Sequence, residues 1–484
     1  MITWKRRLAK VGNFGLAGFR HLTTALAGLL TIPLVARALG ADALGLWALV
    51  GTAAFALGLA DAGLGVAVQR AHVRGVAAET RRTIGVAIAV ILVVAPLLAV
   101  VSWFALLDLP HVDAALALDA RRAAIVAFAG GAIGALASPF RALLVVRGAL
   151  GELTRVRTVA VVLQVAITWA GLALTRSLVA PAAGVLVSSL IETIGSARAA
   201  RRLDPELALR PVAPRGFAEL RKLLAEGAAS LAVNVAGILA LRFDVVILSR
   251  VSPLATVAAY GVASRVVDQS FTLAKQTSLA LLPRLANKDD RSRAVRVGTA
   301  LLGGAVAAGM GALVTQGDGL LVAWAGDVAS RPETAVAVAI LAAATVFSAG
   351  HEIAASALTL AGRSAWDAAL PLVAGYAINL VFSIVFASRL GVVAVSLGTL
   401  LGNAVTSLAL WSRASSLLGW RANAVAWTLA PVAVAGLAAL GTGRVIALAG
   451  KTGLGWSVVG CSAAMLAGLG ALAASSAVAR RRAP

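Results

Sequence analysis

Long apolar stretches, each about 20 residues in length, alternate with short polar segments along the whole chain. A stretch of this length crosses the hydrocarbon core of a bilayer as a helix. The pattern predicts an all-α polytopic membrane protein with about 14 transmembrane helices; twelve is the alternative, because the close pairs 158–197 and 368–412 can be counted differently. The 14 spans fall near residues 12–36, 43–69, 83–107, 123–146, 158–175, 178–197, 223–249, 253–283, 297–316, 334–360, 368–388, 390–412, 423–443 and 454–479.

A polar segment rich in Pro and Arg, residues 201–222, separates six predicted spans from eight. The two parts share a weak repeat at an offset of about 213 residues, in which Arg37 ends the first span and Arg250 ends the seventh. Two six-helix halves of the same orientation are typical of transporters. We predict an N-terminal lobe (1–200), a cytoplasmic linker (201–222) that is either a hinge or a solvated loop, a C-terminal lobe (223–415) and two additional C-terminal helices (416–484).

Composition supports a membrane protein and excludes several kinds of chemistry. Of the 484 residues, 60% are hydrophobic and 13% are charged, which is far from the composition of a soluble enzyme. One Cys and four scattered His predict no metal site and no cofactor. The segment GTGRVIALAGKTG has Val445 where a phosphate-binding loop requires Gly, so we expect no nucleotide. No loop is long enough to fold as a domain, so any activity must lie in the membrane. We expect no catalytic residues and no enzyme activity.

The net charge of +22 would suggest nucleic acid as a partner if the chain were soluble. Of the 43 Lys and Arg residues, however, 29 fall on one side of the 14-span arrangement and nine on the other. Positive charge gathers in cytoplasmic loops of membrane proteins. The excess charge therefore predicts that both termini lie in the cytoplasm and that nucleic acid is not a partner. The high content of Ala, Gly, Val and Arg suggests a bacterial protein, so we expect the inner membrane as its location.

Eleven ionisable residues lie inside the predicted spans, where each would cost about 2.5–3.5 kcal/mol if it faced lipid at the bilayer centre. They must therefore face water, one another or a ligand. The eleven are Arg20, Asp61, Arg141, Glu192, Glu226, Arg242, Asp244, Arg265, Asp268, Lys275 and Glu352.

Helical spacing and depth divide these residues into two groups. Arg265, Asp268 and Lys275 share one face of their helix, because they recur with Thr272 at steps of three or four. We expect salt-bridge or snorkelling roles for Glu192, Glu226 and Arg242. We expect a role in lining a substrate path or gate for Arg20, Asp61, Arg141, Asp244, Arg265, Asp268, Lys275 and Glu352.

Two segments resemble a known family. The run IPLVARALGADALGLWALVGTAAFALGLADAGLGVAVQR (32–70) resembles the first helix pair of the bacterial polysaccharide transport flippases, with their ARxLGxxxxGxxAL turn and DxGLxxAxxR end. The segment RFDVVILSRVSPLATVAAYGVASRVVDQSFTLAKQTSLALLPRLA (242–286) resembles their seventh and eighth helices. This family of O-antigen and oligosaccharide flippases is related to the lipid II flippases, within the multidrug/oligosaccharidyl-lipid/polysaccharide exporter superfamily.

The resemblance implies a V-shaped pair of six-helix lobes around a cationic cavity. It implies that the protein moves a polyprenyl-pyrophosphate-linked oligosaccharide or polysaccharide precursor from the cytoplasmic to the periplasmic leaflet by alternating access. The substrate-binding residues would be Arg20, Arg141, Arg265 and Lys275, because guanidinium and ammonium groups bind phosphate oxygens. The gate, counter-ion or coupling residues would be Asp61, Asp244, Asp268 and Glu352, with Asp61 and Asp268 holding the cations of the empty cavity.

The expected partners are the lipid-linked glycan, membrane lipids and glycosyltransferases or a polymerase of the same pathway. One alternative is a cation-coupled multidrug exporter of the same superfamily, in which acidic residues should dominate the cavity. The intramembrane cations are instead concentrated on the first, fourth and eighth spans. A second alternative, a polytopic glycan polymerase or glycosyltransferase, would need a catalytic base and usually a sizeable extramembrane loop.

Overall fold

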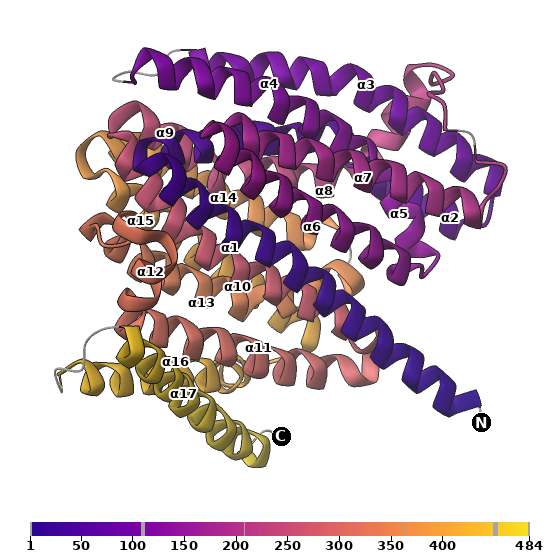
Figure 1. The fold of residues 1–484 in the computed structure, drawn as a ribbon. Helices are drawn as coiled ribbons and strands as arrows, with labels where there is room; N and C mark the ends of the chain where they lie inside the picture. Colours follow the sequence, from indigo (N-terminus) through magenta and orange to yellow (C-terminus); the bar gives the residue numbers. More distant parts are fainter. Residues whose placement is uncertain (1, 108–111, 208, 363, 449–453, 483–484) are drawn as a thin grey trace. The chain divides into compact units, whose positions relative to one another are not determined.

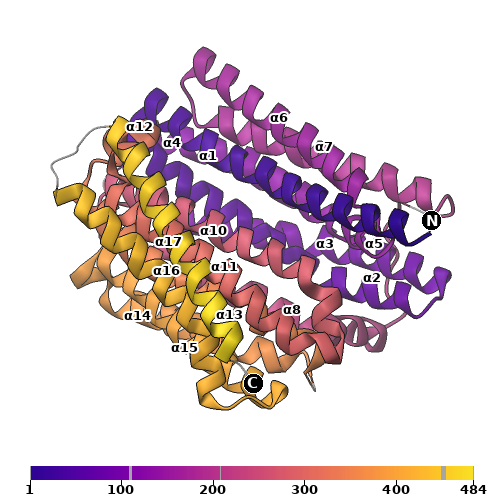
Figure 2. The ribbon, with the colours of Figure 1, turned by 90° about the horizontal axis from the view of Figure 1, so that it is seen from below.

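A computed structural model describes residues 2–107, 112–207, 209–362, 364–448 and 454–482. The side chains are described for all of these residues except 2–27, 105–107, 239–241, 271–280, 282–283, 286, 454, 456 and 474–482. Over the described residues the chain is helical and contains no strand (Figures 1 and 2). It divides into two compact units, Met1–Ile238 and Leu239–Pro484.

The first compact unit is built from long helices that pack along one another (Figure 1). Here α7 packs against α4 and α6, α1 packs against the same two helices, and α2 packs against α3 and α5. The elements are α1 (Ile2–Ala56), η1 (Leu57–Asp61), α2 (Leu64–Val73), α3 (Ala77–Leu107), α4 (Ala114–Leu136), α5 (Ser138–Val146), α6 (Leu150–Thr175), α7 (Val179–Leu203) and α8 (Phe217–Leu241), within which the unit ends.

The second compact unit is organised around α13, which packs against α10, α11 and α15. In addition, α14 packs against α15, and the last two helices, α16 and α17, pack against α11. The elements are α9 (Phe243–Val251), α10 (Leu254–Ala286), α11 (Lys288–Gln316), α12 (Asp318–Ala325), η2 (Gly326–Val328), α13 (Pro332–Ala361), α14 (Trp366–Leu390), α15 (Val392–Leu418), α16 (Ala422–Leu448) and α17 (Leu454–Arg482).

The structure confirms the predicted fold class, because every predicted span lies in one helix or in a run of consecutive helices. The first two spans join at Gly40, whose φ of 86° interrupts the helical backbone of α1. Eleven described helical stretches are long and apolar enough to cross a membrane. Together with the exposed apolar side chains described next, this makes the chain a multi-pass membrane protein.

Large apolar side chains are exposed along the outer faces of several helices. On α3, Val93, Leu97 and Val101 have exposed fractions of 64%, 61% and 67%. A water-facing surface rarely carries such a continuous apolar strip, whereas a lipid-facing surface requires one. Where helices meet, small residues permit close approach: Gly398 and Gly402 of α15 lie against Asn379 and Gly375 of α14. The G-x-x-x-G spacing of this pair predicts such packing.

Three predicted spans are broken in their interior, and these breaks position polar groups. The second span stops at η1 and resumes at α2 after Gly63, which has a φ of 76°. The fourth span breaks between α4 and α5, where Pro139 lies in the first turn of α5. The seventh breaks at Arg242, between α8 and α9. Broken helices leave backbone groups free to serve a polar site inside a membrane protein.

The polar linker is held against α3 by ion pairs. Arg81 Nε lies 2.9 Å from Asp204 Oδ2, and the guanidinium of Arg82 donates to both carboxylate oxygens of Glu219 at 2.7 and 2.8 Å. The backbone N–H of Val212 donates to the Gly85 carbonyl at 3.0 Å. These contacts fix both ends and the middle of the linker to the first compact unit.

The division into lobes at 201–222 stays a prediction, because the boundary along the chain between the two compact units falls inside α8.

Candidate functional site

A polar pocket of about 250 Å³ lies in the first compact unit where two broken spans meet α8. The walls come from the segment around the start of α2, from α5 and from α8. Its lining residues are Asp61, Gly63, Gly65, Val66, Gln69, Ser138, Arg141, Ala142, Val145, Ser230 and Asn234. Two of the residues selected from the sequence, Asp61 and Arg141, therefore share this pocket, which we call the N-terminal pocket.

Asp61 joins the two helix breaks. Ser138 Oγ donates to Asp61 Oδ2 at 2.6 Å, and the backbone N–H of Gly63 donates to Asp61 Oδ1 at 2.9 Å. The sequence analysis expected Asp61 to hold a cation, but its described partners are a hydroxyl and an amide. The physical reason is local. The turn at Gly63 directs a backbone N–H at the carboxylate, and this nearby donor takes the place that a long basic side chain would otherwise occupy.

Arg141 is the basic side chain of the N-terminal pocket. Its Nη1 lies 3.8 Å from Glu192 Oε2, and that same oxygen accepts a shorter bond, 2.8 Å, from Arg157. The salt-bridge role expected for Glu192 is thus confirmed, with Arg157 as the nearer partner. Because Glu192 is already paired, Arg141 keeps donor capacity for a further anion in the pocket.

Glu226 of α8 pairs with Arg74, which follows α2. This hydrogen bond raises the pKa of the Arg74 guanidinium. The salt-bridge role expected for Glu226 is therefore also confirmed. Beside this pair, Gly63 and Gly227 approach so closely that a Cβ on Gly63 would lie 2.7 Å from the Gly227 carbonyl oxygen.

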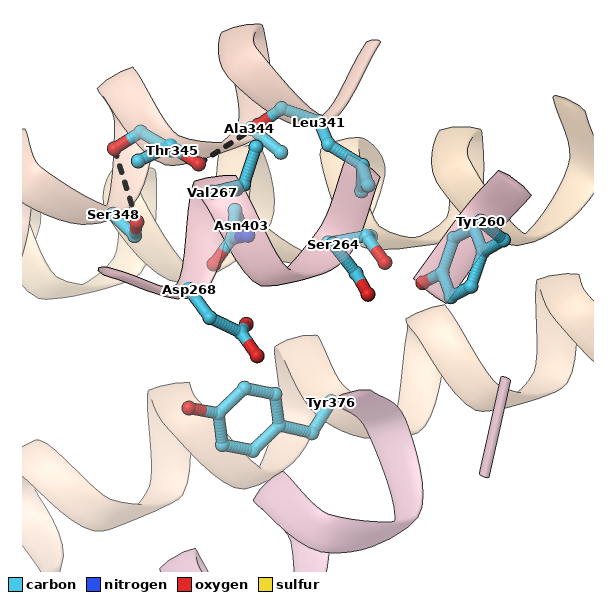
Figure 3. Close-up of a pocket in the computed structure, with 11 residues that line it drawn as sticks. Tyr260, Ser264, Val267, Asp268, Leu341, Ala344, Thr345, Ser348, Tyr376 and Asn403 are labelled. Carbon is cyan, nitrogen blue, oxygen red and sulfur yellow. Dashed lines mark hydrogen bonds between the residues drawn. The ribbon is translucent and has the colours of Figure 1, made fainter. Parts of the chain in front are cut away.

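A second pocket, of about 40 Å³, lies in the second compact unit among α10, α13, α14 and α15 (Figure 3). We call it the C-terminal pocket. In Figure 3 the Asp268 carboxylate and the Ser264 hydroxyl point toward the side of the pocket on which the Tyr376 ring lies. The lining residues are Tyr260, Ser264, Val267, Asp268, Leu341, Ala344, Thr345, Ser348, Tyr376, Thr399 and Asn403.

Asp244 lies next to the C-terminal pocket and is fully buried. Its Oδ2 accepts hydrogen bonds from the Tyr260 hydroxyl at 2.9 Å and from Thr399 Oγ1 at 3.4 Å. Asn379 and Ser383 of α14 also face this carboxylate. Among the described residues no Lys or Arg forms an ion pair with it. A buried carboxylate surrounded by neutral oxygen and amide groups has the donor chemistry that binds a small cation or a proton.

Asp268 pairs with Arg242, whose Nη2 lies 2.9 Å from Asp268 Oδ2. The sequence analysis expected a salt-bridge or snorkelling role for Arg242, and the structure shows the salt bridge. The cation held by Asp268 is thus Arg242, whereas the gating role of Asp268 stays a prediction. Arg242 lies at the junction between α8 and α9, and from there its side chain reaches α10. Arg265 then forms no ion pair with another described side chain, although Asp268 is only one helical turn away.

The remaining residues selected from the sequence are Arg20, Lys275 and Glu352. The side chains of Arg20 and Lys275 lie outside the described residues. Glu352 lies on α13 and is close enough to act electrostatically on Tyr376. The sequence analysis did not single out Ser138, Tyr260 or Tyr376 as site residues. The available signal was that Tyr260 and Tyr376 are the two tyrosines of the chain and both fall inside apolar spans.

Residues 11–287, more than half of the chain, match the family described as polysaccharide biosynthesis protein. The chain belongs to this family. The resemblance seen in residues 32–70 and 242–286 is thereby confirmed. None of the curated proteins matches the sequence.

The fold of this family member is shared with transporters of known structure. The lipid II flippase MurJ, in its inward closed conformation, has a TM-score of 0.74 at 14% sequence identity, covering 97% of this chain and 98% of that chain. An inward-facing multidrug resistance MATE family transporter of the MOP superfamily has a TM-score of 0.64 at 18% identity, with 82% and 95% covered. The Vibrio cholerae MATE transporter VcmN in its bent form has a TM-score of 0.58 at 14% identity, with 85% and 96% covered.

Proposed function

We propose that this protein is a flippase that moves polyprenyl-pyrophosphate-linked oligosaccharide or polysaccharide precursors from the cytoplasmic to the periplasmic leaflet by alternating access. Membership of the polysaccharide biosynthesis protein family is the observation that carries the proposal. The fold shared with the lipid II flippase MurJ agrees with it. The lipid-linked precursor and membrane lipids are the partners, and glycosyltransferases or a polymerase would act before or after it on the same precursor.

The substrate would be recognised through its pyrophosphate. Arg141 and Arg265 are basic side chains inside apolar spans that lack a close ion-pair partner of their own, and Arg20 and Lys275 lie in spans as well. Guanidinium groups bind phosphate oxygens through paired hydrogen bonds, each worth about 1.5–3 kcal/mol when a charge is involved. A pyrophosphate would accept hydrogen bonds from those donors of the basic side chains that the described protein groups do not occupy.

The carboxylates would supply gating and coupling. Asp268 holds Arg242, and Asp61 holds the hydroxyl of Ser138, so each fixes a broken span in one arrangement. Asp244 would bind the coupling cation or proton, and Glu352 would contribute charge on α13. The helices α16 and α17 present exposed apolar side chains, among them Leu437 and Leu466, suited to a polyprenyl tail.

Flipping of a labelled polyprenyl-pyrophosphate sugar by purified protein in liposomes tests the proposal. Arg265→Ala and Arg141→Ala should each lower the flipping rate about tenfold or more, because each removes a charge-assisted hydrogen bond. Arg20→Ala should behave in the same way. The matched control is Arg155→Ala: its side chain is 82% exposed and pairs at 3.6 Å with Glu152 of the same helix. Wild-type rates in all the Arg variants inside spans would refute the assignment.

A cation-coupled multidrug exporter is the second candidate, favoured by the shared MATE fold and by the buried polar cluster around Asp244. The same liposomes separate the two candidates. An exporter would move a cationic drug, would require Asp244 and would be insensitive to Arg265→Ala. A flippase would move the lipid-linked sugar and would require Arg265.

We also propose the bacterial inner membrane as the location, with both termini in the cytoplasm. The distribution of Lys and Arg over the loops supports this orientation. A Cys461→Ser background removes the one cysteine of the chain. A cysteine then added at either end should react with an impermeant maleimide only after the cells are opened.

A further inference from the structure

Polar side chains reach the C-terminal pocket from every side, although most of its lining surface is apolar. Hydroxyl, amide or carboxylate groups reach it from each of its four helices: Ser264 and Asp268 from α10, Thr345 from α13, Tyr376 from α14, and Thr399 from α15. A cavity of purely packing origin would be lined by apolar groups and would stay dry. The polar side chains that reach this pocket therefore favour an occupant that can form hydrogen bonds.

The volume decides which occupant fits. About 40 Å³ is too small for a sugar ring or a phosphate group with its contacts. A bound water needs about 10–15 Å³ of such volume and two to four polar partners. The pocket therefore has room for about two or three waters, and its side chains provide enough donors and acceptors to hold them.

Two side chains of this pocket also touch Asp244. Tyr260 and Thr399 both line the pocket, and both donate to Asp244 Oδ2. The other carboxylate oxygen, Asp244 Oδ1, has no hydrogen-bond partner among the described residues. At the other side of the pocket Asp268 faces the same space and carries the ion pair with Arg242. Asp244 is fully buried, whereas the Asp268 side chain is 24% exposed.

We propose that the C-terminal pocket holds bound water that links Asp268 to the Tyr260 and Thr399 hydroxyls bonded to Asp244, and that this hydrated link is the route by which a small cation or a proton reaches Asp244. The Arg242–Asp268 ion pair lies at the exposed end of the route. A cation that enters must compete with Arg242 for the Asp268 carboxylate. Passage of the cation is therefore coupled to breaking of that ion pair. The presence of the water is independent of the proposed function; the use of the route rests on the coupling role proposed for Asp244.

X-ray hydroxyl-radical footprinting with mass spectrometry tests the hydration, because radicals formed from bound water oxidise the side chains beside it. The full-length protein in detergent is used. Tyr260 is only 2% exposed, so its oxidation reports internal water; Phe140, 4% exposed within an apolar cluster, is the control. We expect the oxidation rate of Tyr260 to be at least about three times that of Phe140. Equal slow oxidation of both rings would overturn the proposal.

Filling the pocket provides the matched comparison. Ala344→Val adds two methyl groups at the pocket wall, and Ala342→Val adds the same groups on the same helix away from it. Oxidation of Tyr260 should fall about threefold in Ala344→Val and stay unchanged in Ala342→Val. If Ala344→Val fails to elute as a single folded species, Ser264→Leu fills the pocket from α10. Unchanged oxidation of Tyr260 in a folded filled variant would overturn the proposal.

The route itself is tested by ¹⁹F NMR of protein labelled with 3-fluorotyrosine. The chain has two tyrosines, and both line this pocket, so both signals come from the site of interest. Tyr376→Phe assigns the Tyr260 signal. Replacing choline with Na⁺, or lowering the pH, should shift the Tyr260 signal, and Ala344→Val should abolish or slow that response. No response to either cation, or the same response in the filled variant, would overturn the route.

These measurements need no transported substrate, so they are distinct from the test of the proposed function. A dry pocket in a protein that flips lipid-linked sugar would remove this inference alone. A hydrated, cation-responsive pocket in a protein that flips no lipid-linked sugar would remove the proposed function and leave the hydrated link in place.

Discussion

Asp244 combines complete burial with neutral neighbours. Its carboxylate accepts from Tyr260 and Thr399, and it has no ion-pair partner among the described residues. A buried charge without a counter-ion is costly, whereas a neutral amide of the same shape can accept the same hydrogen bonds. At the scale of the single residue, therefore, the carboxylate of Asp244 should serve cation binding and lower the stability of the protein.

Asp244→Asn should leave the protein at least as stable as the wild type, while Asp244→Ala should lower the free energy of unfolding by about 1–3 kcal/mol. The asparagine keeps an acceptor for the Tyr260 hydroxyl, whereas the alanine leaves that buried hydroxyl unsatisfied. Thermal unfolding in detergent measures both. Both variants should lose the cation dependence of transport in liposomes. An asparagine variant as unstable as the alanine variant would contradict this account.

At the scale of elements, broken helices and close backbone contacts determine where polar groups gather. The N-terminal pocket exists because two spans break, at Gly63 and before Ser138, at places where α8 can approach. The approach of α8 depends on Gly227, where the absence of a side chain lets the Gly63 carbonyl come into contact. The linker before α8 is held by Arg81 and Arg82 of α3.

Gly227→Ala should destabilise the protein by about 1–3 kcal/mol, because its Cβ would meet the Gly63 carbonyl and force the segments apart. Gly51→Ala in α1 is the matched control. Nothing lies within 4 Å of a Cβ at Gly51, so that change should be neutral or stabilising by up to about 1 kcal/mol. The midpoint of thermal unfolding distinguishes them; equal midpoints would show that the contact at Gly227 is not tight.

Arg82→Ala should make the linker several-fold more sensitive to proteases. The guanidinium of Arg82 donates to both oxygens of Glu219 and also to the Ala213 carbonyl at 3.3 Å, so its loss frees the end of the linker from α3. Arg210→Ala removes an exposed charge from the same linker and serves as the control. Limited proteolysis of the purified protein measures the cleavage rate of the linker in each variant. Equal cleavage rates would mean that other contacts hold the linker.

At the scale of the whole molecule, the loops on one side of the 14-span arrangement hold most of the Lys and Arg residues, and the charges inside the spans nearly cancel. Such a distribution favours one orientation in the membrane. In the proposed function, the few charges inside the spans would act on the substrate. A lipid-linked pyrophosphate carries negative charge outward, in the direction that an inside-negative potential favours. Each elementary charge that crosses the full field gains about 2.3 kcal/mol per 100 mV.

The flipping rate in liposomes should therefore rise when a potential that is negative on the cytoplasmic side of the protein is imposed, and fall when its sign is reversed. A potassium gradient with valinomycin sets the potential, and the same gradient without valinomycin is the control. A rate that does not change with voltage would argue that a co-transported proton or Na⁺ compensates the charge of the substrate.

The sequence by itself determined the all-helical fold class and the positions of the spans. The bilayer imposes both, because an apolar stretch of about 20 residues has one stable way to cross hydrocarbon. The same reasoning selected the ionisable residues inside spans, including Asp61, Arg141 and Asp244. Helical periodicity, however, defines a face only within one helix.

Only the tertiary structure decided which of these residues meet. Asp268 pairs with Arg242 instead of its neighbour on α10, Asp61 binds Ser138 across 77 positions of the chain, and two tyrosines share one pocket. These pairings depend on where helices break and on which small residues let distant helices touch. Both are properties of packing between segments that are far apart in the sequence, and no local pattern encodes them.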